Sequence, residues 1–214
     1  MNEQSTTMEK FSKVITLAGS AILMNLLFLI ACLPIVTIGQ AWAGLASALR
    51  YQIRGDKWIA GFKAGFLHRF WRGTLAWCIM LPINAFMISD VNDALVQGAT
   101  VPLVFAGLMS MLTVGLTVSL LMMNVYIPTK VGTWITNSVN MVFKAPLQLA
   151  VSAVLFTFPV LCLLLWFDVF YFAIMIFVAA YYTVAALVVT MLLKQPLIYY
   201  LLEARAQNLL IEEE

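Results

Sequence analysis

Long apolar runs separated by short polar segments dominate the chain. Runs of roughly twenty apolar residues match the ~30 Å hydrocarbon thickness of a bilayer at helical rise. The pattern predicts an all-α fold, a polytopic membrane bundle over residues 14–194, with a polar tail at 1–13 and an amphipathic, then acidic tail at 195–214. The predicted spans, of which the second is short, are residues 14–33, 35–49, 73–89, 101–125, 147–166 and 169–193.

Two amphipathic stretches interrupt the apolar runs. In residues 50–72, aromatic and apolar residues from Trp58 to Phe70 recur at near-helical spacing among basic residues. In residues 126–146, one helical face is apolar around Trp134 and the other is polar around Asn137. Basic residues beside an aromatic stripe are typical of a helix in the headgroup layer. A nucleic-acid-binding patch is the rival interpretation, but both stretches are short and lie between spans.

The few charges of the chain are unevenly distributed. Only 10% of residues are charged, against about 25% in soluble domains. Half of the twelve Lys and Arg residues lie within 50–72. Basic loops mark the cytoplasmic side. Basic and Lys/Arg-free loops alternate only if the short segment 35–49 crosses the membrane. This predicts six membrane helices, arranged as three in-out-in hairpins with both termini in the cytoplasm. It also predicts an acidic outer loop at Asp90 and Asp93 and a very tight outer turn at Asp168.

The segment 33–49 is the most irregular part of the predicted membrane region. Leu33, Pro34, Thr37 and Gly39 are predicted to form a structural motif at the outer apex of the first hairpin, because proline ends a helix. Pro34 and Gly39 would set the angle between the first two helices. Small residues follow, which favours close helix packing, with a re-entrant element lining a cavity as the alternative. The candidate partner interface comprises Ala41, Gly44, Ala48, Trp58, Phe62, Phe66 and Trp134.

A weak internal repeat links the later segments. Trp58 and Trp134 each open an amphipathic helix, and each helix precedes a span that contains a proline, Pro82 or Pro159. These features recur at an offset of about 76 residues. Parallel repeats of this kind occur in transporters.

Chemistry-bearing motifs are missing from the sequence. There is no phosphate-binding loop, nucleophile elbow, zinc-protease motif or CxxC pair, so the chain is predicted to be non-enzymatic, without cofactor or metal. An intramembrane active site drawing on Asp90, Asp168 and His68 is the remaining enzymatic alternative. The spans also lack the ionisable residues that proton or ion coupling needs. Candidate polar lining residues for a neutral solute are Asn25, Gln40, Asn84 and Asn124, although helix–helix hydrogen bonding is their commoner role.

One stretch resembles a known family. Asn25-Leu26-Leu27, the segment Leu33–Gly39, a small-residue helix and Phe62-Lys63-Ala64-Gly65-Phe66 together resemble the YesL-like family of bacterial membrane proteins, a domain of unknown function. The loop 50–66 is shorter and less acidic than expected for that family. The resemblance implies residence in the bacterial plasma membrane and association with oligosaccharide ABC importers. It transfers no catalytic residue.

Three functions follow as hypotheses. The first is an accessory subunit that packs against the permease subunits of an ABC-type oligosaccharide importer, with membrane lipid as its other partner, no nucleic acid, and a neutral oligosaccharide involved only indirectly. The second is a substrate-binding membrane subunit, similar to those of energy-coupling-factor importers. The third is a permease subunit proper, since Phe70–Leu75 resembles the end of a permease coupling loop.

Overall fold

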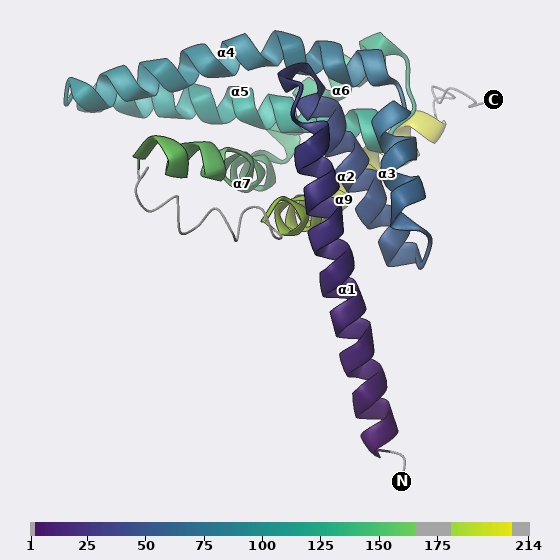
Figure 1. The fold of residues 1–214 in the computed structure, drawn as a ribbon. Coiled ribbons are helices and arrows are strands. Elements are labelled where there is room, and N and C mark those ends of the chain that lie inside the picture. The colour runs from purple at the N-terminus through teal and green to yellow at the C-terminus, as the bar shows by residue number, and fades with distance from the viewer. Residues whose placement is uncertain (1–2, 166–180, 207–214) are drawn as a thin grey trace.

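The chain is helical throughout the part that is described. The structure, a computed structural model, describes residues 3–165 and 181–206, with side chains placed for 15–158 and 181–206. Over these residues the chain forms eight α-helices and no strand, which confirms the all-α prediction. The helices, with the 3-10 turn η1 (Ile35–Thr37) before α2, are α1 (Glu3–Ala31), α2 (Ile38–Arg54), α3 (Trp58–Leu67), α4 (Phe70–Val96), α5 (Thr100–Tyr126), α6 (Val131–Lys144), α7 (Pro146–Leu165) and α9 (Tyr182–Ala206) (Figure 1).

The helices do not share one direction. α4 and α5 form a long antiparallel hairpin, whereas α1 runs across that hairpin, and α2 returns beside the upper part of α1 (Figure 1). A simple bundle of parallel hairpins would place α1 alongside α4 and α5. The first predicted hairpin is therefore present as α1 and α2, but its direction differs from that of α4 and α5.

Three helices are long and apolar enough to cross a membrane by themselves: α4, α5 and α9. A fourth span results only if α6 and α7, which meet at a bend of 102°, are counted together. The apolar part of α1, Ile15–Ala31, is shorter. Length and composition thus support three or four spans in the described residues, and the six spans predicted from the charge pattern are not confirmed.

Several helices continue beyond the limits of the predicted spans, and the predicted loop at Asp90 and Asp93 is helical. α4 continues through the predicted acidic loop at Asp90 and Asp93 and ends only at Val96, because helix-compatible residues follow the two aspartates. Glycine at position 98, with φ of +65°, makes the turn instead. α1 begins at Glu3 inside the predicted polar tail, and α9 continues past residue 194 to Ala206. Residues 166–180, including the predicted turn at Asp168, lie outside the described part.

Both predicted amphipathic helices are present, as α3 and α6. Each leads into a long apolar helix through a very short irregular link. The link is His68 and Arg69, the latter with φ of 47°, before α4, and Ala145 alone before α7. α3 packs tightly on α2, because a Cβ at Gly61 would lie 2.6 Å from the Tyr51 ring and one at Gly65 would lie 2.7 Å from a backbone oxygen of α2. One face of α3 is therefore covered by α2, whereas residues on other faces, such as Ile59 and Lys63, are exposed.

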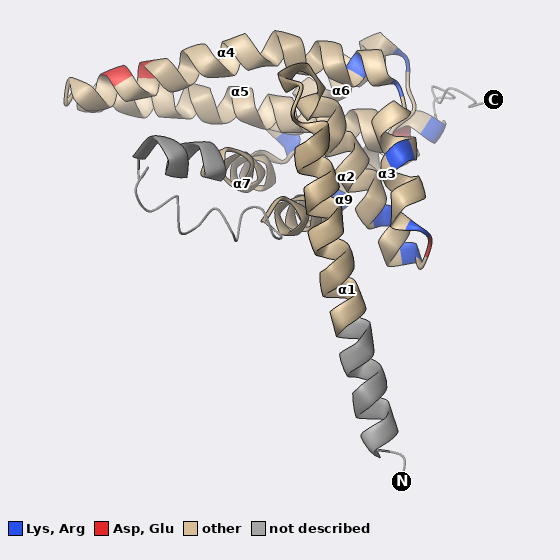
Figure 2. Cartoon of the chain, in the orientation of Figure 1, with Lys and Arg blue, Asp and Glu red and all other residues tan. Residues whose placement is uncertain are grey.

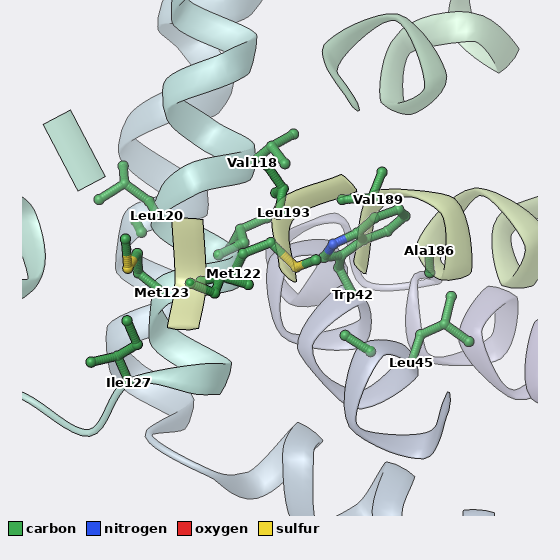
Figure 3. Packing of buried hydrophobic residues seen from close by; sticks show 14 of the residues in the cluster. Trp42, Leu45, Val118, Leu120, Met122, Met123, Ile127, Ala186, Val189 and Leu193 are labelled. Atoms are coloured by element: carbon green, nitrogen blue, oxygen red, sulfur yellow. The ribbon is translucent and has the colours of Figure 1, made fainter. Parts of the chain in front are cut away.

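The hydrophobic core is centred on α2. All of its residues from Gly39 to Leu49 are buried, which confirms close packing for the small-residue segment. Trp42 and Leu45 of α2 belong to one buried cluster with Val118 and Met122 of α5 and Val189 of α9 (Figure 3). The small side chains of α2 let the surrounding helices approach it closely, and a protein-covered helix of 17 residues has little surface left for lipid.

Candidate functional site

The Leu33–Gly39 segment forms a capped turn between α1 and α2. The Thr37 hydroxyl donates to the carbonyl oxygen of Ala31 at 2.6 Å and is 2.7 Å from that of Pro34. Indole Nε1 of Trp77 in α4 donates to the Ile35 carbonyl oxygen at 2.8 Å. Carbonyl groups at a helix end lack intrahelical partners. The turn thus supplies a hydrogen-bond donor to a carbonyl group at the end of α1, and the Trp77 bond joins the turn to α4.

Gly39 is the residue of this segment that decides how α2 meets α4. A Cβ at Gly39 would lie 2.7 Å from the Trp77 Cβ and 3.1 Å from the Gly73 carbonyl oxygen. Pro34 lies exposed at the start of the 3-10 turn, and Leu33 is 80% exposed. The four predicted motif residues therefore separate into two exposed residues that begin the turn, one cap and one close-packing glycine.

We expect Thr37→Val to destabilise the fold more than Pro34→Ala. The valine removes a hydroxyl that caps the α1–α2 turn, at a cost of about 1–2 kcal/mol. Pro34 is exposed, and its loss should change the free energy of unfolding by less than about 1 kcal/mol. Thermal unfolding of the detergent-solubilised variants measures both. A larger loss for Pro34→Ala would show that the proline, and not the cap, holds the turn.

Gln40 and Asn124 come together around Gly73. Both amides are fully buried, and Gln40 Nε2 donates to the His68 carbonyl oxygen at 2.6 Å, which ties α2 to the end of α3. A Cβ at Gly73 would collide with Gln40 Oε1 and lie 3.2 Å from Asn124 Nδ2. Among the described residues, Gln40 Oε1 and Asn124 Oδ1 have no hydrogen-bond partner. Gly73, whose missing side chain makes room for the two amides, was not identified from the sequence.

The other two predicted lining residues lie elsewhere. Asn25 Oδ1 accepts from the Thr183 amide of α9 at 3.3 Å, and Asn84 Nδ2 donates to the Thr117 hydroxyl of α5 at 2.8 Å. Both bonds join neighbouring helices. Asn84 is about 16 Å along α4 from Gly73 at helical rise. The four residues therefore do not line one cavity, and two of them act as helix–helix links.

Most of the predicted partner interface is internal to this chain. Five of its members are buried, while Trp58 and Phe66 are partly exposed; the buried members are Ala41, Gly44, Ala48, Phe62 and Trp134. The prediction of an interface along α2 is wrong, because these residues are already buried within the chain. The small residues of α2 allow α3 to pack closely on it. A Cβ at Gly44, for example, would lie 3.2 Å from the Phe62 carbonyl oxygen.

Trp134 instead forms part of an apolar groove between α4, α5 and α6. The groove has a volume of about 470 Å³ and is lined mainly by aliphatic side chains, including Ile79 and Ile135. The indole and the guanidinium of the groove each bond within the chain. Trp134 Nε1 donates to the Leu120 carbonyl oxygen at 3.0 Å, and Arg72 Nη1 donates to the Thr129 carbonyl oxygen at 2.8 Å. The Arg72 guanidinium also lies over the Trp134 ring, 5.5 Å from its centroid.

The residues of the enzymatic alternative are not assembled. His68 caps the end of α3, whereas Asp90 lies near the far end of α4, roughly 30 Å away at helical rise. Asp168 is outside the described residues. Within the described part of the chain, no group of three or more His, Cys, Asp and Glu residues is arranged to hold a metal ion.

The length and composition of the apolar helices define an all-helical membrane protein. Residues 21–91 match the family described as "Protein of unknown function, DUF624", which includes the YesL-like proteins. The match covers α1 from its middle onward, the capped turn, α2, α3 and most of α4. It confirms the resemblance seen in the sequence. No curated protein and no solved structure matches the chain.

Proposed function

We propose that this chain is a non-enzymatic integral membrane accessory subunit of an ABC-type oligosaccharide importer in the bacterial plasma membrane. It packs against the importer's permease subunits through the apolar groove between α4, α5 and α6. The link to an importer comes from the family resemblance, and the location of the contact comes from the groove. The groove is the observation that carries the proposal.

The groove suits a transmembrane helix better than a polar solute. Ile79 of α4 is 60% exposed and Ile135 of α6 is 46% exposed, so apolar surface is presented along both walls. The indole and guanidinium groups already bond within the chain. An incoming helix could therefore pack on the aliphatic walls without breaking either bond. Helices in membranes associate through this kind of close van der Waals packing.

The outer half of the α4–α5 hairpin has a different surface. Phe86, Val104 and Phe105 are exposed there, and the hairpin extends away from the core around α2 (Figure 1). At 27 residues each, the two helices are about 40 Å long, which exceeds the ~30 Å hydrocarbon core. We assign this convex apolar surface to lipid, which makes it a control region for the groove.

Site-specific photocrosslinking in native membranes tests the proposal. A photoreactive side chain at Ile79 is expected to crosslink to a permease subunit of the importer, whereas one at Val104 should label lipid. Ile79→Trp, which adds bulk to the groove, is expected to reduce co-purified permease about tenfold, which corresponds to about 1.4 kcal/mol. The matched control, Phe105→Trp, should leave co-purification unchanged.

Two results would contradict this assignment. Purification that brings no permease, with a small solute retained by the isolated chain, would favour the substrate-binding subunit. Equal loss of permease with Ile79→Trp and Phe105→Trp would show that the groove is not the contact.

A further inference from the structure

A second cavity lies where the C-terminal ends of α2, α5 and α9 meet the second half of α3. Its volume is about 380 Å³, which is about a dozen times the roughly 30 Å³ that one water molecule occupies. It differs from the apolar groove in its lining. The side chains that matter here are Ser47, Arg50, Tyr51, Arg54, His68 and Arg205.

The cavity concentrates positive charge. Arg50 and Arg54 lie one turn apart on α2, so they share one face of that helix. Arg205 comes from the last turn of α9. No Asp or Glu is among the described residues that line the cavity. The acidic residues of α4, Asp90 and Asp93, lie at the other end of the molecule, near the tip of the α4–α5 hairpin (Figure 2).

Arg50 is the most enclosed of the three arginines, whereas Arg54 and Arg205 are exposed. Arg50 is half-buried, and its guanidinium carbon lies 5.6 Å from the centroid of the Tyr126 ring. Ser47 is buried beneath it on the same helix. Gly65 of α3 permits this closeness, because a Cβ there would lie 3.0 Å from the Ser47 hydroxyl oxygen. A guanidinium held against an aromatic ring loses less freedom when it binds an anion.

Guanidinium groups recognise phosphate through paired hydrogen bonds. Three of them around one cavity repel one another unless an anion is present. We propose that this cavity binds a phosphate group, carried either by the headgroup of an anionic phospholipid or by a soluble phosphorylated compound. The cavity lies at the ends of α5 and α9, two candidate spans, where lipid headgroups are within reach. Basic pockets between membrane helices bind such headgroups.

The experiment compares two triple variants with the same change in charge. Arg50→Gln/Arg54→Gln/Arg205→Gln removes the charge of the cavity, and Lys57→Gln/Lys63→Gln/Lys194→Gln removes three exposed charges outside it. The full chain is purified in neutral detergent and examined by native mass spectrometry for retained phosphatidylglycerol. Thermal stabilisation by phosphatidylglycerol, phosphatidylcholine and inorganic phosphate is then measured separately.

We expect the unmodified chain and the lysine variant to retain phosphatidylglycerol or to be stabilised by it, and the arginine variant to bind at least tenfold more weakly. Stabilisation by inorganic phosphate without lipid retention would also support the site and would indicate a soluble phosphorylated ligand. Should the arginine triple variant not fold, the exposed Arg54→Gln alone is expected to weaken binding severalfold.

Two outcomes would overturn the proposal. Equal loss of binding in the arginine and lysine variants would mean attraction by general surface charge. A lower unfolding temperature of the arginine variant with unchanged binding would mean that the arginines only complement the negative ends of the helix dipoles.

Discussion

Replacing Trp42 with alanine is expected to lower the free energy of unfolding by about 3–5 kcal/mol. Trp42 is 0% exposed at the centre of α2. Its ring meets Phe28 of α1 at 6.2 Å and Phe156 of α7 at 5.1 Å between centroids. The substitution therefore opens a cavity where three helices meet, and tightly packed neighbours cannot collapse fully into it.

Trp71→Ala is the matched control for this prediction. Trp71 is 73% exposed on the first turn of α4, so its loss should change stability by less than about 0.5 kcal/mol. Thermal unfolding of both variants is measured in the same detergent, with far-UV circular dichroism as the signal because it reports helix content and does not rely on tryptophan fluorescence. A similar decrease for the two would contradict the placement of α2 at the centre of the fold.

The second large effect is expected at Gly65. A Cβ at this position would collide with the Ser47 Cβ and lie 2.7 Å from the Ala43 carbonyl oxygen. Neither atom is the end of a flexible side chain, so α3 must move away from α2. Overpacking of this kind costs about 1–3 kcal/mol. Gly65→Ala should therefore lower the unfolding temperature by roughly 3–10 °C for a chain of this size.

Two further variants separate the collision from a general effect of alanine. Gly107→Ala in α5 introduces a side chain into open space, and alanine in place of a helical glycine is expected to be neutral or to stabilise by up to about 1 kcal/mol. Ser47→Gly removes one of the two clashing groups, so the double variant Ser47→Gly/Gly65→Ala should be more stable than the sum of its single changes. Strict additivity of the two changes would argue that α3 does not pack on α2 in this way.

The sequence pattern predicted the helices better than their limits. The apolar runs located α4 and α5, and the aromatic spacing located α3 and α6. The end of α4 was placed too early, because Asp90 and Asp93 resemble a loop although α4 continues to Val96. A short polar stretch at the end of a membrane helix has the same composition whether the backbone remains helical or turns.

The sequence predicted two of the polar residues that meet around Gly73, but it assigned the small residues of α2 to a contact with a partner. The sequence identified Gln40 and Asn124 as candidate lining residues of a polar site, but not Gly73, beside which the structure places both amides. It also identified small residues along α2 as an interface. The same residues serve contact within a chain and contact between chains, since both need close backbone approach.

Residue types and their order by themselves determined that this is an all-helical membrane protein, with irregular residues between its first two helices and half of its Lys and Arg residues in one short stretch. These properties follow from local periodicity and from the free energy of transferring apolar or charged groups between water and lipid. Only the tertiary structure decided that α1 crosses the α4–α5 hairpin, that α2 is covered by protein, and that Arg50 and Arg205 meet at one cavity. These properties depend on contacts between residues far apart in the chain, which local patterns do not encode.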